Sequence, residues 1–167
     1  DDGQLDLTDL DQLLDGVKLL GLSAMSNVLG TLTPVRRLTD AARAVGAVSL
    51  IDACQYVPHL ATDVGAWGAD FAAFTGHKMC GPTGIGVLWG TEAILDATPP
   101  FLTGGEMILN VTKEGFTPNE LPWKFEAGTP PIAEAVGLGA AVDYLTGLGM
   151  AAVRAHEVAL TGYALRT

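Results

Sequence analysis

The sequence is poor in several residue types, and each shortage argues against a class of protein. Only two of its 167 residues are cysteines, Cys54 and Cys80, and they form no CxxC pair. This argues against a disulfide-stabilised secreted domain and against a cysteine-ligated zinc site. Nine lysines and arginines stand against 19 aspartates and glutamates, and the net charge of -10 opposes broad binding to nucleic acid or to an anionic membrane. These shortages favour a cytoplasmic protein with neither nucleic acid nor membrane as a partner.

Long uninterrupted apolar runs are also missing. The mean hydropathy is positive, at +0.33, but Gly, Asp, Pro or Thr interrupts each apolar stretch before the roughly 20 residues that a membrane-spanning helix needs. The first ten residues are acidic and lack the basic start and apolar stretch of a signal peptide. The sequence does contain 49% hydrophobic residues, which is enough to form a single buried core in one domain.

Apolar residues recur with two alternating periods along the first half of the chain. Helical spacing predicts an amphipathic helix over 7–17, with Asp6 or Thr8 as its N-cap, and a second helix over 34–45 that ends at Gly46. Nearly continuous apolar runs predict strands, the first of them covered on both faces. These strands span 18–25, 47–51, 70–74 and 84–89. Helices that alternate with such strands predict a parallel sheet with flanking helices, an α/β fold.

The second half of the sequence has less periodicity. A helix is expected to begin over 91–97, and two more helices over 132–148 and 150–165 are separated by Gly149. Between them, residues 98–129 are rich in Gly, Pro and Thr and predict a long irregular excursion, which is often a functional feature.

Three of the predicted strands are followed by polar residues that could form a ligand site. Ligands of open α/β sheets bind at the carboxyl ends of strands, and there the sequence has Asn27, Asp52 and Lys78. Taken singly, Asp52 could be a turn carboxylate or an N-cap, and Lys78 a solvated surface lysine. Taken together, a neutral lysine amine can form a Schiff base beside a carboxylate. With Thr75 and His77 as anion donors, the set matches what pyridoxal phosphate needs from a protein.

Four motifs follow one another over nearly the whole chain. They are Ser26-Asn27-Val28-Leu29-Gly30-Thr31, Asp52-x-x-Gln55, Thr75-Gly76-His77-Lys78 with the following Gly81-Pro82-Thr83-Gly84-Ile85-Gly86, and Phe125-Glu126-Ala127-Gly128-Thr129-Pro130. In these motifs the sequence closely resembles class V aminotransferase-fold enzymes, and among them a Suf-type (group II) cysteine desulfurase. The resemblance implies a fold-type I pyridoxal-phosphate-dependent transferase large domain, a mostly parallel sheet flanked by helices, incomplete at both ends.

The resemblance also implies a role for each motif residue. Lys78 forms the internal aldimine and later transfers protons as acid and base, and Asp52 forms a salt bridge with the pyridinium nitrogen. The cofactor's phenolic oxygen is contacted by Asn27 and Gln55. Its phosphate is bound by Thr75, His77 and, from the partner subunit, Thr129. Pyridoxal 5'-phosphate as cofactor and a homodimer are therefore expected.

Other parts of the family pattern do not occur in these residues. The persulfide-forming cysteine of the family lies well beyond the lysine, as does the arginine that binds the substrate carboxylate, and an upstream phosphate loop is also missing. We therefore expect residues 1–148 to be a partial cofactor-binding domain and 149–167 a helix leading toward an absent C-terminal domain. The chain by itself is expected to be catalytically incomplete.

Several weaker features predict no further site. Cys54 is expected to pack as a small apolar residue, and the isolated His59 and His156 give no reason to expect a metal site. The glycine-rich 81–86 run lacks the Lys-Ser/Thr of a nucleotide-binding loop and is expected to allow close backbone packing near Lys78.

The function expected from the resemblance is a cysteine desulfurase that supplies sulfur for iron-sulfur cluster assembly. Its partners would be L-cysteine, a second copy of the chain and a sulfur-acceptor protein. Two alternatives stay open at this point. One is a selenocysteine lyase or another enzyme of the same fold, and the other is a non-catalytic scaffold or interaction domain.

Overall fold

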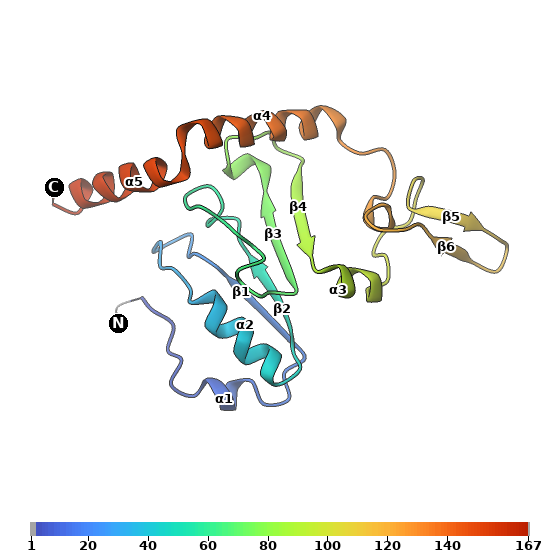
Figure 1. The fold of residues 1–167 in the computed structure, drawn as a ribbon, viewed down its shortest axis with the longest axis horizontal. Helices are drawn as coiled ribbons and strands as arrows, with labels where there is room; N and C mark the ends of the chain where they lie inside the picture. Colours follow the sequence, from blue (N-terminus) through green and yellow to red (C-terminus); the bar gives the residue numbers. More distant parts are fainter. Residues whose placement is uncertain (1–2, 167) are drawn as a thin grey trace.

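The centre of the molecule is a four-stranded sheet in a computed structural model that describes residues 3–166 (Figure 1). Asp1 and Asp2 of the acidic beginning, and Thr167, lie outside the described residues. The strands β1 (Leu19–Ser23), β2 (Val48–Asp52), β3 (Phe71–Thr75) and β4 (Gly86–Gly90) lie side by side in chain order. The α/β fold predicted from the sequence is confirmed.

Three of the four strands are parallel, and the last reverses direction. β1 pairs with β2 and β2 with β3 in parallel, whereas β3 pairs with β4 antiparallel, with Thr75 opposite Gly86. The reversal follows from chain length, because a parallel connection needs a crossover of about a dozen residues or more. The chain between β3 and β4, residues 76–85, is shorter than that and contains only the 3-10 turn η1 (Gly76–Lys78).

Helix α2 (Val35–Ala44) connects β1 to β2 and closely matches the predicted helix. Its buried side chains are Val35, Leu38, Thr39 and Ala42. The chain leaves the helix through Gly46, at a φ of 72° that glycine adopts without strain. The core beside the sheet consists of Ala24, Val35, Ile51, Ala53, Trp67, Ala69 and Ala72.

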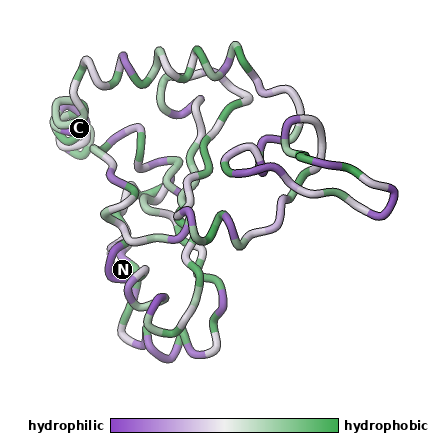
Figure 2. Tube along the Cα trace, turned by 45° about the vertical axis from the view of Figure 1, so that its right-hand side comes forward, coloured by the Kyte–Doolittle hydropathy of each residue, from purple (hydrophilic) through white to green (hydrophobic). Residues whose placement is uncertain are grey.

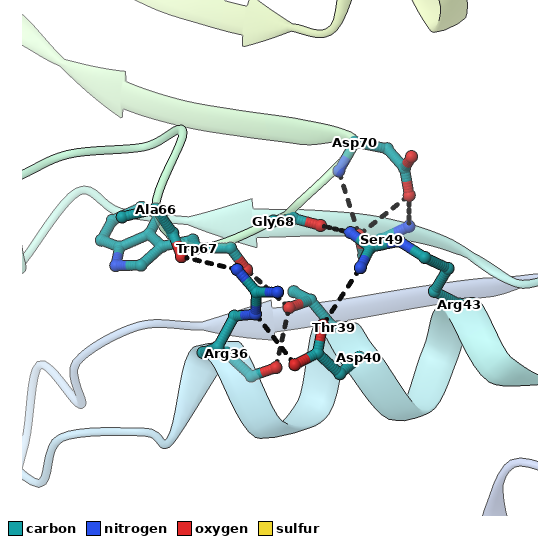
Figure 3. Close-up of polar contacts among 9 residues, drawn as sticks. All are labelled: Arg36, Thr39, Asp40, Arg43, Ser49, Ala66, Trp67, Gly68 and Asp70. Carbon is teal, nitrogen blue, oxygen red and sulfur yellow. Dashed lines mark hydrogen bonds and ion pairs between the residues drawn. The ribbon is translucent and has the colours of Figure 1, made fainter.

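Two arginine side chains of α2 join the helix to the loop before β3 through hydrogen bonds, and one aspartate holds both of them in place (Figure 3). Asp40 accepts hydrogen bonds from Arg36 at 2.8 Å and from Arg43 at 3.0 Å, so that the two guanidinium groups lie on either side of one carboxylate. The same arginines also donate to the backbone carbonyls of Ala66 and Gly68. The loop that precedes β3 is thereby held against α2.

A buried hydroxyl makes a further bond between these two segments. The Thr39 side chain, 1% exposed, donates to the Trp67 carbonyl at 2.6 Å. The Trp67 ring packs edge-on against Tyr56, with the ring centroids 5.1 Å apart. The segment between β2 and β3 is therefore ordered by packing and hydrogen bonds, although it contains no α-helix.

The first predicted helix is much shorter in the structure. Only α1 (Leu10–Leu13) forms, and its N-cap is Asp9 without a side-chain capping bond. Asp6 does not cap it, since its carboxylate binds the backbone N–H and the hydroxyl of Thr8 in a separate turn. The predicted helix over 7–17 and its two proposed N-caps are thus wrong.

The prediction that the first strand is covered on both faces is also wrong for the described residues. β1 ends at Ser23, and alternate residues are exposed, with Leu19 at 59%. The chain leaves the strand because Met25 pairs with Leu32 in an isolated antiparallel bridge. This bridge closes the turn that contains Asn27.

The excursion over 98–129 follows α3 (Glu92–Ala97) and contains more regular structure than its composition predicts. Strands β5 (Ile108–Val111) and β6 (Phe116–Pro118) form an antiparallel hairpin, and a 3-10 turn η2 (Trp123–Phe125) follows. Figure 2 shows the hairpin extending away from the rest of the chain, with a hydrophilic tip. Gly104 and Gly105 lie before this hairpin and do not form its turn.

Two helices end the described chain as predicted, α4 (Ile132–Leu148) and α5 (Met150–Ala164). They are bent by 74° at Gly149, whose φ is 80°. Within residues 3–166 no single helix is long and apolar enough to span a membrane, and only this bent pair has sufficient length and composition when taken together. The apolar residues of α4 are distributed over all faces of the helix, yet only Ala141 and Leu145 are buried.

Candidate functional site

The carboxyl ends of β1, β2 and β3 lie next to one another. Asp52, the last residue of β2, pairs in register with Ser23 on one side and with Ala73 on the other. The Ala24 N–H donates to the Asp52 carbonyl at 2.8 Å, and the ladder continues from Ala53 to Ala73 at the same distance. The strand ends that the sequence predicted to carry ligand residues therefore form one edge of the sheet.

A cavity of about 660 Å³ opens at this edge, and we call it the strand-end cleft. Four of the predicted site residues line it: Asn27, Asp52, Gln55 and Lys78. Its volume lies within the roughly 300–1,000 Å³ that is usual for small-molecule sites. An amine, a carboxylate and two amides thus face a common space, although they come from three separate segments of the sequence.

Asp52 is an exposed carboxylate held by the turn that follows it. Its Oδ1 accepts the backbone N–H of Cys54 at 2.9 Å. The residue is therefore a turn carboxylate, one of the two structural roles open to it from sequence, and it lines the cleft as well. The turn bond orients the carboxylate toward the backbone of the residues that follow it.

Cys54 lies in the wall of the cleft beside Asp52. Burial raises the pKa of the Cys54 thiol, and the neighbouring Asp52 carboxylate raises it further, while Lys78 has the opposite effect. The side chain stays a neutral thiol at neutral pH, because both larger effects disfavour the thiolate. Cys54 was predicted to act only as a small packing residue, and that prediction did not include its position at the cleft.

The other two residues predicted from the third motif are paired with each other. The Thr75 hydroxyl and His77 Nδ1 are 2.8 Å apart. Thr75 ends β3, and His77 lies in η1 directly before Lys78. Both belong to the described residues, yet neither lines the strand-end cleft. The pair is a local hydroxyl and imidazole unit next to the cleft.

Close backbone packing orders the turn that presents Lys78. The N–H groups of Met79 and Gly81 both donate to the Gly76 carbonyl at 3.0 Å, and Gly76 itself donates to Ile85. A Cβ at Gly76 would come within 2.9 Å of the Ile85 side chain, and one at Gly81 within 2.8 Å of the Gly76 carbonyl. The prediction that the glycine-rich run permits close backbone packing near the lysine is confirmed.

Lys78 also lines a second cavity of about 460 Å³ on another side of the same turn. This cavity is walled by α4 and α5, including Tyr144 and Leu145, and by His59 from the segment after β2. His59 Nδ1 lies 2.6 Å from the Glu157 carboxylate of α5. The lysine turn is thus bordered by two cavities of different lining.

Thr129 is the one predicted site residue that lies apart from the others. It is exposed in the turn between η2 and α4 and lines neither the strand-end cleft nor the second cavity. The Gly128 N–H beside it donates to Gly105 at 2.9 Å. Within one copy of the described chain, Thr129 does not join the cleft residues.

Ser23 and Thr33 are among the cleft residues that the reasoning from sequence missed. The Thr33 hydroxyl donates to the Ser23 carbonyl at 2.6 Å and so links the end of β1 to the start of α2. Only the place of Ser23 at a strand end could have marked it. Across the part of the chain that the structure describes, no group of three or more His, Cys, Asp or Glu side chains could hold a metal ion.

Comparison with known proteins shows which family this chain belongs to. The family model for aminotransferase class V matches residues 1–167. The chain belongs to this family. It is 54% identical over 99% of its length to the Streptomyces coelicolor protein named "Probable cysteine desulfurase", and 53% identical over 98% to the "Cysteine desulfurase" of Haloferax volcanii.

Solved structures show the same fold in this family. The apo structure of a cysteine desulfurase from Thermococcus onnurineus matches 90% of the chain, with a TM-score of 0.85 and 41% identity. The chain covers 38% of that structure, and it spans about 40% of the length of the two curated relatives. The fold-type I assignment and the resemblance to cysteine desulfurases are both confirmed.

Proposed function

We propose that these residues are the central part of a pyridoxal-phosphate-dependent cysteine desulfurase. The observation that carries the proposal is the placement of Lys78 and Asp52 on one cleft with Asn27 and Gln55. A chain kept only as a scaffold has no physical reason to hold an amine and a carboxylate together at such a cleft. The curated relatives that are named cysteine desulfurases give independent support.

The chemistry of the donor set fits pyridoxal phosphate. Among the described residues, Lys78 offers the only side-chain amine that lines the cleft, for the cofactor's aldehyde, and Asp52 a carboxylate for its pyridine nitrogen. The amides of Asn27 and Gln55 would contact the phenolic oxygen. When bound, the cofactor supplies an electron sink for negative charge that develops at the substrate Cα.

The remaining predicted residues would bind the cofactor phosphate. Thr75 and His77 offer a hydroxyl and an imidazole N–H within one short segment, and their mutual contact at 2.8 Å already orients them. Thr129 is exposed and does not line the cleft of its own chain, as expected of a residue that serves the partner subunit. A homodimer, with Thr129 reaching the partner's phosphate, is part of the proposal.

The overall reaction balances without an external oxidant. A cysteine thiolate of the enzyme, outside these residues, attacks the sulfur of L-cysteine, and the carbon–sulfur bond breaks. The electron pair stays with the carbon, which takes a proton and becomes the methyl group of L-alanine, while the enzyme cysteine becomes a persulfide. Within this chain Lys78 would move protons at the substrate Cα, and Asp52 would keep the pyridine nitrogen protonated.

The biological setting proposed for this enzyme is sulfur supply for iron-sulfur cluster assembly in the cytoplasm, through a sulfur-acceptor protein. Residues 1–148 would form part of the cofactor-binding domain, and the helix that follows Gly149 would lead toward a further domain. The Suf-type subgroup remains a prediction from the sequence motifs.

The decisive experiment is borohydride reduction of the natural polypeptide that carries these residues, after incubation with pyridoxal phosphate. Peptide mapping by mass spectrometry should find the pyridoxyl adduct on Lys78. Lys78→Ala should abolish the adduct and lower the rate of alanine release by more than about 100-fold, since proton transfer by one positioned side chain contributes 10²–10⁴-fold. The matched control is Lys18→Ala, at an exposed lysine before β1, which should keep both.

The products separate the alternatives. Alanine with a protein persulfide supports a cysteine desulfurase. A strong preference for selenocysteine, or a keto acid as product, would indicate another enzyme of the same family. Absence of any adduct in the natural polypeptide would indicate the non-catalytic scaffold and would overturn the proposal.

A further inference from the structure

Lys124 is a buried charged residue whose position the proposed reaction does not explain. Its side chain lies in η2, and the residue is 9% exposed. Burying an ammonium group costs free energy unless its N–H donors have acceptors. The acceptors of Lys124 therefore indicate its structural role. The predicted site residues do not include it.

The partners of Lys124 are backbone carbonyls at the end of another helix. Its Nζ donates to the Asp96 carbonyl at 2.8 Å and to the Leu95 carbonyl at 3.2 Å, and lies 5.6 Å from the centre of the Phe125 ring. Both carbonyls belong to the last turn of α3, where the helix end carries a partial negative charge, and the Leu95 carbonyl also accepts the Thr98 N–H at 3.3 Å. Lys124 thereby ties η2 to the C-terminal end of α3.

The segment anchored in this way leads directly into the turn that carries Thr129. The N–H of Glu126 donates to Trp123, the first residue of η2, at 3.0 Å. Two residues later Gly128 donates to Gly105 at 2.9 Å and has a φ of 86°. The turn is therefore held at two places, by Gly105 on one side and through η2 by Lys124 on the other.

We infer that Lys124 is a positioning residue that fixes the 128–130 turn, so that Thr129 is presented in one orientation to the phosphate group of a cofactor bound by the partner subunit. This inference rests on the proposed function for the identity of the ligand. Its structural half, the anchoring of the turn by Lys124, does not. When an exposed turn is mobile, a hydroxyl on it binds phosphate more weakly. Forming the hydrogen bond then requires the turn to be ordered, which costs conformational entropy.

The test compares two forms of the cofactor in the natural polypeptide. Binding of pyridoxal phosphate and of pyridoxal, which lacks the phosphate, is followed by absorbance, and the ratio of their dissociation constants reports phosphate recognition. Thr129→Ala and Lys124→Met should each lower the preference for pyridoxal phosphate by about tenfold or more, as expected for one lost hydrogen bond to a charged group. Combining them should add little further loss.

Controls separate positioning from general damage to the fold. Lys113→Met, at the exposed tip of the hairpin, should leave the ratio unchanged. Lys124→Gln keeps an amide donor for one of the two carbonyls and should give an intermediate ratio. A role that is only structural would weaken the binding of both cofactor forms equally and leave the ratio at its normal value.

A second readout needs no cofactor. In Lys124→Met, hydrogen exchange of the Gly128 amide should accelerate while the strands of the central sheet keep their protection. Unchanged exchange at Gly128, an unchanged ratio, or loss of folding in both Lys124 variants would overturn the inference. If the unsubstituted protein binds neither cofactor form, the proposed function fails, and the assignment of the phosphate fails with it, whereas the exchange result still reports the anchoring.

Discussion

The Asp70 carboxylate accepts both the backbone N–H and the hydroxyl of Ser49, at 2.8 and 2.9 Å (Figure 3). Ser49 is 1% exposed and lies in β2, while Asp70 directly precedes β3. The Asp70 N–H donates in return to the Ser49 hydroxyl at 3.0 Å. The pair closes one end of the β2–β3 ladder, at whose other end Asp52 lies opposite Ala73.

Removing this carboxylate should destabilise the protein. In Asp70→Ala the buried N–H and hydroxyl of Ser49 lose their acceptor, and we expect the free energy of unfolding to fall by about 2–3 kcal/mol. Urea denaturation of the natural polypeptide measures the loss. Asp143→Ala, at an exposed position of α4, should change the value by less than about 0.5 kcal/mol. Equal effects of the two substitutions would contradict the role given to Asp70.

The Cys54 thiol should react slowly at neutral pH. Burial, followed by the Asp52 carboxylate, raises its pKa, so the reactive thiolate forms only at a higher pH than in an unfolded chain, where thiols titrate near about 8.5. Alkylation by iodoacetamide, followed at the Cys54 peptide by mass spectrometry, should be slower in the folded protein than in urea at the same pH. The difference should diminish as the pH rises.

The Asp52 contribution to this effect can be tested separately. Asp52→Asn removes the negative charge beside the thiol, so alkylation of Cys54 at neutral pH should accelerate. The peptide containing Cys80 serves as an internal reference for accessibility in the same digests. Folded and unfolded chains that react at equal rates at neutral pH would refute the raised pKa.

Helix α5 should depend on the contact between His59 and Glu157. No residue of this helix is buried, and the 2.6 Å contact ties it to the segment after β2. The two side chains are 33% and 30% exposed, so we expect Glu157→Gln to cost less than about 1 kcal/mol in global stability. The local effect should be larger, with faster hydrogen exchange over Met150–Ala164.

The control for this prediction is Glu114→Gln at the exposed tip of the hairpin, which should leave the exchange of α5 unchanged. His59→Phe should reproduce the effect of Glu157→Gln, because either substitution removes the same contact. If α5 keeps its protection in both variants, its orientation is determined by α4 and not by this pair.

Much of the fold could be predicted because apolar periodicity is a local property of the chain. The strands that became β2 and β3, the helix that became α2 and the break at Gly149 all lie close to their predicted positions. Predictions were wrong where other local interactions competed with the structure that the apolar pattern favours. The helix predicted over 7–17 is only four residues long in the structure, since Asp6 and Thr8 form a turn of their own and no residue of α1 is buried.

By itself the sequence determined the class of fold and the residue types of the site, because apolar periodicity marks the strand ends and the residue identities there define the available functional groups. Only the tertiary structure decided which of them meet. Asn27, Asp52, Gln55 and Lys78 share a cleft, while Thr129 lies elsewhere, since the pairing of β1, β2 and β3 brings distant segments to one edge. The burial of Lys124 against α3 was likewise decided by packing between segments far apart in sequence, which no local pattern specifies.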